Sequence, residues 1–344
     1  MQAIERGVKL WGLNVSASRA TTGNHSLYEK LESNLSEYFR SEAAVCVGSG
    51  YLGNLAAAQA MAGEFSVALL DERAHPALRD AALALGCPVR TFRHRDPASM
   101  SRLLRKSEAR PIVLTDGMFS HDGSIAPLRE YLAALPKSGR IMVDDAHGAG
   151  LVGPNGRGTP ALLRVPRARI IQTITLSKAF GVYGGAVLGS RDLADKIRDG
   201  SRAYIGSTPL PLPLTAAALV AVQILARDRS LRRRLERNCA YFAKHAPRSI
   251  LRGPTTPNPI FGLVPQTTAS VRHHHDTLRK NGIFPSFIKY PGGPASGYFR
   301  FVISSEHTRK QLDALAGALT ITLRTKDQGR GGSAVCYLAE LGEW

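Results

Sequence analysis

The chain has 344 residues, of which 44% are hydrophobic and 21% are charged, a composition typical of a globular protein with one large domain and one smaller domain. No apolar stretch reaches the roughly 20 residues that a membrane span needs, and the first residues lack a signal-peptide pattern, so we expect no membrane contact and a cytoplasmic location. The formal net charge of +18 is compatible with a basic solvated surface, with attraction of anionic small molecules or with a nucleic-acid partner. Because no nucleic-acid-binding motif is visible, we expect no nucleic-acid partner.

Short apolar runs alternate with helical stretches through the first two-thirds of the chain. This alternation predicts parallel strands joined by helical crossovers, and continuously apolar strands predict a sheet covered on both faces. We therefore expect a three-layer α/β domain. The predicted strands are Ala44–Val47, Val67–Leu70, Val89–Phe92, Pro111–Thr115, Ile141–Val143, Ile170–Thr175 and Ala186–Leu188. The predicted helices between them are Ser26–Phe39, Leu52–Met61, His75–Leu85 and Pro97–Ser107.

The last third of the chain predicts a smaller α+β domain. We expect a large domain over residues 1–225, a small domain over 226–325 and a loose tail over 326–344, because Lys326–Ser333 is polar and rich in glycine. The elements predicted around and beyond the boundary are the helices Leu214–Arg227, Ser230–His245 and His307–Leu323, the Pro-rich connection Pro254–Pro259 and the strand Tyr298–Ser304.

Cysteine and histidine residues predict no metal site. The four cysteines lie far apart and form no CxxC pair, so unpaired thiols are expected. The run His273–His275 resembles a metal site, but consecutive side chains do not converge on a helix or a strand. We therefore expect this run to lie in a solvated loop or on a solvated face. The cysteines are Cys46, Cys87, Cys239 and Cys336.

A glycine-rich turn follows the first predicted strand. Residues Gly48–Asn54 read Gly-Ser-Gly-Tyr-Leu-Gly-Asn and lead into a helix. Backbone N–H groups at such a turn suit a phosphate group. Glycine turns are common, so an ordinary turn remains the alternative at this point.

Two further polar clusters follow apolar strands. Asp144 directly follows the apolar run Ile141–Val143. A carboxylate buried there needs a cationic partner such as a protonated pyridine nitrogen. The alternative is an aspartate that caps a helix or binds a metal. Lys178 follows the predicted strand Ile170–Thr175. A buried lysine loses its charge readily, as a lysine that forms a Schiff base must. The alternative is a lysine whose side chain extends to solvent. Together with the glycine turn, these residues predict a pyridoxal 5′-phosphate enzyme.

In order and spacing, four motifs resemble the α-oxoamine synthase family of pyridoxal-phosphate enzymes. The likeness runs from about Ala3 to about Leu323. It implies the aspartate-aminotransferase-like fold, with a three-layer large domain and a smaller α+β C-terminal domain. It also implies a decarboxylative condensation of an amino acid with an acyl thioester, on coenzyme A or acyl carrier protein, that gives an α-amino ketone. The motifs are Thr22-Gly23-Asn24-His25, Leu31-Glu32, Asp144-Asp145-Ala146-His147-Gly148 and Thr175-Leu176-Ser177-Lys178.

The resemblance implies a role for each matching residue. Lys178 matches the lysine that forms an imine with the cofactor, Asp144 the aspartate on its ring nitrogen, and His147 the histidine near its phenolic oxygen; these three are the expected catalytic residues. The remaining cofactor contacts are implied for Ser49, Gly50, Tyr51 and Thr175 at the phosphate, His75 on the ring face, Ser120 at the ring substituents, and Ser207 and Thr208 at the phosphate of a neighbouring subunit. The residues implied to bind substrate are Arg300, at the amino-acid carboxylate, with Asn24 and His25.

Two other functions remain open from the sequence. An aminotransferase shares the ring-binding residues, and a non-catalytic partner or regulator shares the fold. The matched Ser207 and Thr208 imply a homodimer with sites at the subunit boundary.

The chain departs from the family pattern at several places. The family usually has an N-terminal segment before the point where Met1 falls, so we expect either a misassigned start or a different substrate entrance. Tyr28 stands where histidine is frequent, Asp116 where some members have glutamate, and Tyr183 where a small residue is frequent. These departures bear on the acyl substrate more than on the cofactor.

Overall fold

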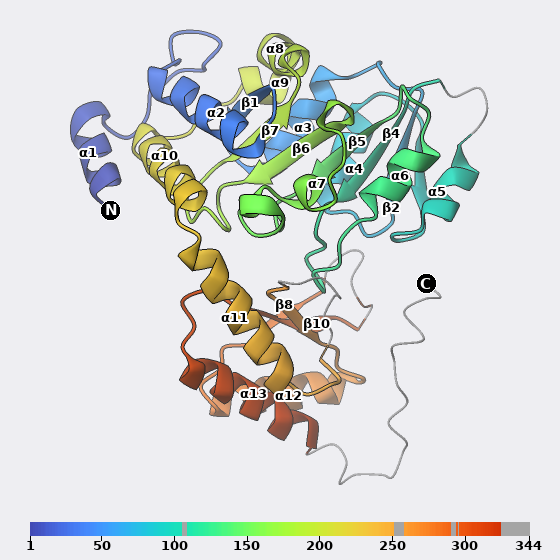
Figure 1. The fold of residues 1–344 in the computed structure, drawn as a ribbon, viewed down its shortest axis with the longest axis vertical. Helices are drawn as coiled ribbons and strands as arrows, with labels where there is room; N and C mark the ends of the chain where they lie inside the picture. The colour runs from blue at the N-terminus through green and yellow to red at the C-terminus, as the bar shows by residue number, and fades with distance from the viewer. Residues whose placement is uncertain (105–108, 251–257, 290–293, 295, 325–344) are drawn as a thin grey trace. The chain divides into compact units, whose positions relative to one another are not determined.

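The chain forms two compact units (Figure 1). The computed structural model describes residues 1–104, 109–250, 258–289, 294 and 296–324. Unit 1 comprises Met1–Phe119 and Ile125–Leu231, and unit 2 comprises Ser120–Ser124 and the chain from Arg232 onward. The domain limits predicted at residues 225 and 325 stay predictions, and the predicted tail lies outside the described residues.

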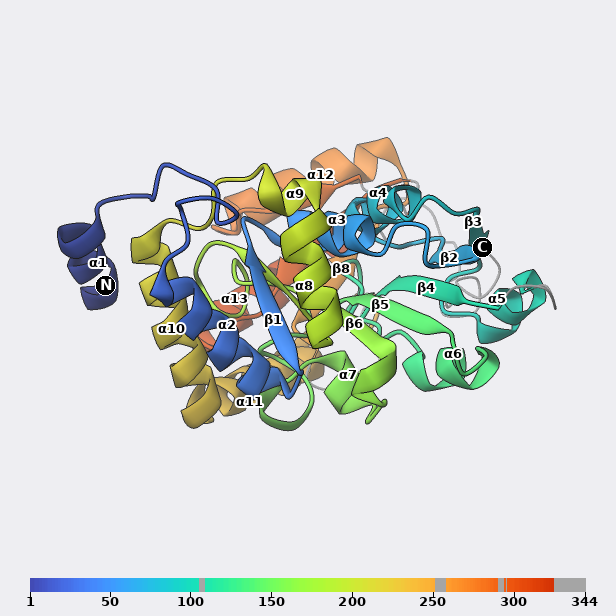
Figure 2. The ribbon, with the colours of Figure 1, turned by 90° about the horizontal axis from the view of Figure 1, so that it is seen from above.

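Unit 1 is built on a seven-stranded sheet, and each predicted strand is found within one residue of its predicted ends. The strand order is β1-β7-β6-β5-β4-β2-β3, and the neighbours from β6 to β3 pair in parallel. Figure 2 shows this sheet between two groups of helices. The strands are β1 (Ala43–Val47), β2 (Val67–Asp71), β3 (Val89–Phe92), β4 (Pro111–Asp116), β5 (Arg140–Asp144), β6 (Ile170–Thr175) and β7 (Gly185–Gly189).

The expectation of parallel strands is wrong for β7, which runs antiparallel to both β6 and β1. The connection from β6 to β7 covers only residues 176–184 and contains no helix. A parallel crossover needs about a dozen residues or more, usually with a helix, so this short connection can only turn the chain back. As a result, β7 begins at the edge of the sheet where β6 ends.

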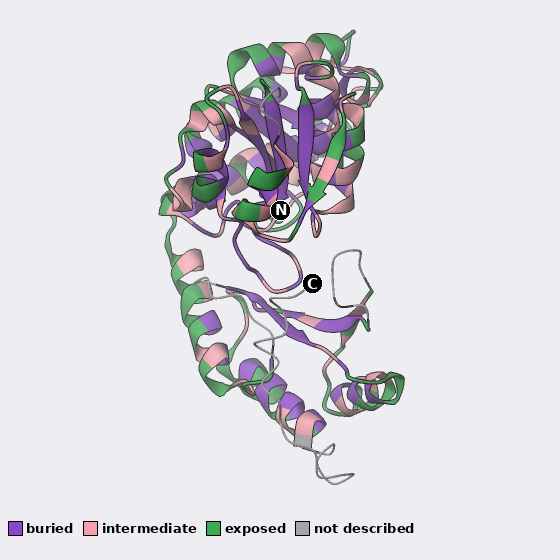
Figure 3. Cartoon of the chain, turned by 90° about the vertical axis from the view of Figure 1, so that its right-hand side faces the viewer, coloured by how far each residue is buried: buried purple, intermediate pink, exposed green. Residues whose placement is uncertain are grey.

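Helices cover both faces of the sheet, so the predicted three-layer fold is confirmed (Figure 3). Alternate strand residues supply opposite faces: Val45 and Val47 pack toward α3, α4 and α8, whereas Ala44 and Cys46 pack toward α2 and α10. The helices are α1 (Gln2–Trp11), α2 (Ser26–Phe39), α3 (Gly50–Ala60), α4 (Pro76–Ala84), α5 (Pro97–Leu103), α6 (Leu128–Ala134), α7 (Thr159–Leu162), α8 (Arg191–Gly200), α9 (Arg202–Ile205) and α10 (Leu212–Arg227), with 3₁₀ turns at η1 (Pro154–Gly156) and η2 (Arg167–Arg169).

Local sequence explains where several of these helices begin. Side-chain caps start α3 at Ser49, α4 at His75 and α5 at Asp96, each accepting a hydrogen bond from the first turn. The helix α10 begins two residues before its predicted start because proline is well accepted in a first turn. The helix α5 ends at Leu103, short of its predicted end; residues 105–108 lie outside the described chain.

Unit 2 has a three-stranded antiparallel sheet in the order β8-β10-β9, packed with three helices. The helix Ser230–His245 is found at its predicted bounds, and its first turn crosses the division between the units. None of the helices in the described ranges combines the length and the apolar character that crossing a membrane requires. The elements are α11 (Ser230–His245), β8 (Ile260–Leu263), α12 (Thr268–Lys280), β9 (Ser286–Ile288), β10 (Tyr298–Val302) and α13 (Arg309–Arg324).

The structure describes the histidine run and three of the four cysteines. His273–His275 lies on α12, and the prediction of a fully solvated run is wrong for His274, which is 1% exposed. Successive helical side chains point in different directions, so the middle residue of the run can face the core while its neighbours do not. Cys46, Cys87 and Cys239 are free thiols, as predicted, and Cys336 lies outside the described residues.

Candidate active site

The glycine-rich turn lies against the end of β6. Val47 and Thr175 both pair with Gly185, so the ends of β1 and β6 flank the start of β7. A Cβ atom on Gly50 would lie 3.1 Å from Thr175 Cβ, and one on Gly185 would lie 2.6 Å from the Gly50 nitrogen. Because side chains larger than hydrogen would push these segments apart, the glycines allow the turn and the strand end to meet.

This turn has the properties of a phosphate site. Ser49 caps α3 by accepting the Leu52 N–H over 3.2 Å. The first N–H groups of a helix have no acceptor within the helix, and the helix dipole favours an anion there. The Thr175 hydroxyl, close to the turn, donates to the Gly184 carbonyl and accepts from the Ser177 N–H, each over 3.2 Å. The predicted phosphate contacts are therefore brought together, and their role stays a prediction.

Asp144 ends β5 as a buried carboxylate held by two donors. Its Oδ1 accepts the Ala146 N–H over 3.1 Å, and its Oδ2 accepts the Asn54 amide over 2.6 Å. Asp116 is its register neighbour on β4 and accepts the His75 N–H over 2.9 Å. Burial, together with the nearby Asp144, raises the pKa of Asp116 well above its usual range. Two carboxyl groups therefore lie side by side, and Asp144 has more donors.

Lys178 and His147 meet at the ends of neighbouring parallel strands. Lys178 Nζ lies 2.9 Å from His147 Nε2, and the two residues follow β6 and β5 respectively. The ammonium can donate to an unprotonated ring nitrogen. The expectation of a buried lysine is wrong, because Lys178 is exposed; its amine is held beside the strand that carries Asp144.

His75 caps α4 at the same edge of the sheet. Its Nδ1 accepts the Ala77 N–H over 3.1 Å, so a neutral ring carries its proton on Nε2. The ring stands edge-on to Tyr51 with 6.3 Å between centroids, and the Tyr51 hydroxyl donates to Asp80. Burial and the nearby Lys178 lower the pKa of His75, partly offset by Asp144. His75 therefore stays neutral near pH 7.

The other predicted residues of unit 1 have local contacts of their own. The Ser207 hydroxyl donates to the Ala203 carbonyl over 2.6 Å, and Thr208 is exposed. Asn24 accepts from Arg19 and donates to Glu29, each over 2.9 Å, and His25 caps α2. Their predicted contacts with a second subunit or with substrate stay predictions.

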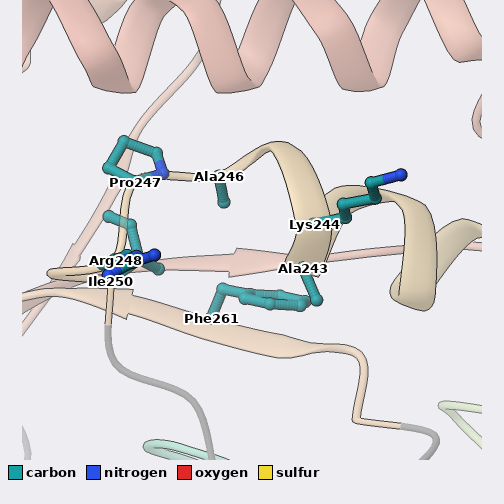
Figure 4. Close-up of a pocket in the computed structure, with 7 residues that line it drawn as sticks. All are labelled: Ala243, Lys244, Ala246, Pro247, Arg248, Ile250 and Phe261. Carbon is teal, nitrogen blue, oxygen red and sulfur yellow. The ribbon is translucent and has the colours of Figure 1, made fainter.

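Two predicted residues belong to unit 2. Arg300 lies on β10, and its Nη1 donates weakly to the Ser120 carbonyl over 3.4 Å. Unit 2 also has a cavity of about 220 Å³ whose lining includes Lys244, Arg248 and Phe261 (Figure 4). None of the predicted site residues lines this cavity, so it is distinct from the predicted site.

The contribution of Asn54 and Thr173 was not predicted from the sequence. In the sequence, Asn54 stands out only as the last residue of the glycine-rich turn, yet its amide contacts Asp144. Thr173 donates to Asn54 over 2.7 Å from within β6. The available signal was the set of polar residues Gln172, Thr173 and Thr175 among the isoleucines of β6, because a buried polar residue needs a partner.

Comparisons with known proteins agree with this arrangement. The family model described as aminotransferase class I and II matches residues 1–319. The chain is 35% identical to an 8-amino-7-oxononanoate synthase of Xylella fastidiosa over 90% of this chain and 78% of that protein. It is 34% identical to a Methylococcus capsulatus protein of the same name over 92% of this chain and 83% of that protein.

Solved structures show the same fold. The serine palmitoyltransferase of Sphingomonas wittichii superposes with a TM-score of 0.87 at 24% identity, covering 95% of this chain and 84% of that one. The 8-amino-7-oxononanoate synthase of Francisella tularensis gives a TM-score of 0.80 at 24% identity, covering 94% and 93%.

Proposed function

Because the chain belongs to the aminotransferase class I and II family, and within it to the α-oxoamine synthases, we propose that it is a pyridoxal-5′-phosphate-dependent acyltransferase. It condenses an amino acid with an acyl thioester, releases carbon dioxide and forms an α-amino ketone. The single observation that carries this proposal is the 2.9 Å contact of Lys178 Nζ with His147 at the strand edge where Asp144 ends β5.

The residues at this edge fit the cofactor. The buried carboxylate of Asp144 matches a protonated ring nitrogen, and the start of α3 matches a phosphate. When bound, the cofactor supplies an electron-accepting ring that stabilises negative charge at the amino-acid Cα. Ser49, Gly50, Tyr51 and Thr175 would hold its phosphate, and His75 would cover its ring. Asp144 would hold the proton at the ring nitrogen.

The remaining residues would act on the substrate. Lys178 would hold the cofactor covalently until the amino acid displaces it. The free Lys178 amine would then transfer the Cα proton. His147 would orient the Lys178 amine beside the cofactor's phenolic oxygen. Arg300 would bind the amino-acid carboxylate through two parallel N–H donors, with Ser120 at the ring substituents. Asn24 and His25 complete the proposed substrate residues.

The acyl group arrives as a thioester of coenzyme A or of acyl carrier protein. The protein is a cytoplasmic homodimer in which Ser207 and Thr208 reach the phosphate of the neighbouring subunit. Small molecules, rather than nucleic acid or membrane, are its partners.

The first experiment tests covalent attachment at Lys178. We expect purified protein with added cofactor to absorb visible light, and borohydride to fix the cofactor on Lys178, as peptide mass spectrometry would detect. Lys178→Ala should bind the cofactor without trapping, because it has no amine there. Trapping on another lysine would contradict the proposal.

The second experiment identifies the reaction. Incubation with an amino acid and an acyl-CoA should release free thiol together with carbon dioxide. A keto acid without free thiol would indicate an aminotransferase. Cofactor trapped on Lys178 without turnover of any amino acid or thioester would indicate a non-catalytic regulator.

A further inference from the structure

Asn54 lies in a chain of buried polar side chains that ends on Asp144. The Thr173 hydroxyl donates to Asn54 Oδ1 over 2.7 Å, and Asn54 Nδ2 donates to Asp144 Oδ2 over 2.6 Å. Thr173 and Asn54 are 0% exposed, and Asp144 is 7% exposed. The three residues come from β6, α3 and β5, so these hydrogen bonds join three separate elements. We call this set the Thr173–Asn54–Asp144 relay.

Asp144 and Thr173 together fix the orientation of the Asn54 amide. An ionised carboxylate only accepts hydrogen bonds, so the amide must present its Nδ2 to Asp144. Its oxygen then faces the Thr173 hydroxyl, which can donate. The reverse orientation would place two acceptor oxygens 2.6 Å apart without a hydrogen between them. The Thr173 hydroxyl therefore holds the amide in the orientation that serves Asp144.

The relay also distinguishes Asp144 from its carboxylate neighbour. Asp116 pairs with Asp144 across β4 and β5 and accepts the His75 N–H over 2.9 Å. Asp144 accepts the Ala146 N–H over 3.1 Å and, in addition, the shorter hydrogen bond from Asn54. The Asn54 amide therefore supplies the shorter of the two hydrogen bonds that hold the Asp144 carboxylate.

We propose that Asn54, held by Thr173, is a positioning residue that fixes the Asp144 carboxylate in the orientation that pairs with the ring nitrogen of the cofactor. This inference rests on the proposed function, because that function assigns the ring nitrogen to Asp144. It predicts that Asn54 acts on cofactor binding only through that nitrogen.

The test compares two ligands on the full-length protein. Dissociation constants are measured for pyridoxal 5′-phosphate and for its 1-deaza analogue, in which a C–H group replaces the ring nitrogen. Asn54→Leu removes the amide at similar size, Thr173→Val removes the hydroxyl at similar shape, and Thr173→Ser keeps the hydroxyl as the matched control.

We expect Asn54→Leu to weaken pyridoxal-phosphate binding about tenfold to hundredfold, the range for a hydrogen bond to a charged group, and the deaza analogue by less than about threefold. Thr173→Val should weaken pyridoxal-phosphate binding by about threefold to tenfold, since it loosens the amide without removing it. Thr173→Ser should bind both ligands like the unmutated protein.

Two results would overturn the inference: an equal loss for both ligands in Asn54→Leu, or unchanged pyridoxal-phosphate binding. If Asn54→Leu does not fold, the ratio of the two constants in Thr173→Val decides in the same way. An unmutated protein that binds neither ligand would instead overturn the proposed function. If the unmutated protein binds pyridoxal 5′-phosphate more tightly than the deaza analogue, and the variants keep the same preference, only the role proposed for Asn54 and Thr173 would be overturned.

Discussion

His75 is held through both its ring and its backbone. Its Nδ1 accepts the Ala77 N–H at the start of α4, and its backbone N–H donates to Asp116. Burial and Lys178 lower the pKa of the ring. A neutral ring is the form that can cap a helix through a nitrogen lone pair.

This shift predicts a pH dependence of stability. The folded state binds the His75 proton less readily than the unfolded chain, whose pKa is near 6.5, so protons favour unfolding. The contribution of His75 is present above about pH 6.5 and is lost as the pH falls below it. We expect His75→Asn, which keeps a capping acceptor, to show a smaller loss of unfolding free energy between about pH 7.5 and about pH 5.5.

Chemical denaturation of the cofactor-free protein at these two pH values measures the difference. Equal losses in the unmutated protein and in His75→Asn would show that His75 titrates alike in both states.

Glu32 shows how a residue of a family motif acquires a structural role. It is 6% exposed, accepts the Cys46 N–H over 2.8 Å and forms an ion pair with Arg19. A second ion pair reaches Arg198 over 3.3 Å. Removing one partner of a buried ion pair leaves an uncompensated charge, so Glu32→Gln should destabilise the protein by about 3 kcal/mol.

Denaturation of Glu32→Gln beside the exposed-pair variant Arg234→Gln measures this loss. Arg234 pairs with Glu306 at the surface, where ion pairs contribute little. Similar stabilities of the two variants would contradict a structural role for the Glu32 network.

At the level of elements, the reversal of β7 is what brings the predicted phosphate residues together. The short β6–β7 connection returns the chain at the edge where β1 also ends. Gly185 then faces the backbone of the Ser49–Gly50 turn, where a Cβ atom would lie 2.6 Å from main-chain atoms. Main-chain atoms cannot rotate away from such a contact.

Gly185→Ala should therefore destabilise unit 1 by about 1–3 kcal/mol and weaken pyridoxal-phosphate binding, because the turn must move to admit the methyl group. Gly189→Ala on the same strand is the matched control. Its added Cβ would meet the end of the Leu193 side chain at 2.9 Å, which can rotate. Unfolding free energies and cofactor titrations check both, and equal effects would contradict the argument from the turn.

For the whole molecule, the net charge of +18 bears on the proposed acyl substrate. Coenzyme A carries several phosphate charges, and a basic protein attracts such a ligand over distances that salt shortens. We expect kcat/KM for an acyl-CoA to fall at least about threefold between about 50 and about 500 mM salt. A thioester of the same acyl group without phosphates is the control. An equal salt effect on both thioesters would show that charge attraction does not contribute to substrate binding.

The sequence by itself determined the strands of unit 1 and the polar residues at their ends. Apolar runs, glycine turns, Asp144 and Lys178 are local features, and the shared direction of β5 and β6 places the residues at their carboxyl ends along one edge of the sheet. The predicted phosphate residues of the glycine turn, in contrast, meet Thr175 only through the reversed strand β7.

Only the tertiary structure decided how these residues are supported. Asn54 and Asp144 are separated by 90 positions, and Thr173 and Asn54 by 119, so no local pattern records their contact. The reversal of β7 and the burial of His274 likewise depend on the elements that pack against them. Long-range contacts are chosen by the packing of whole elements, whereas periodicity along the chain reports only which face of each element is apolar.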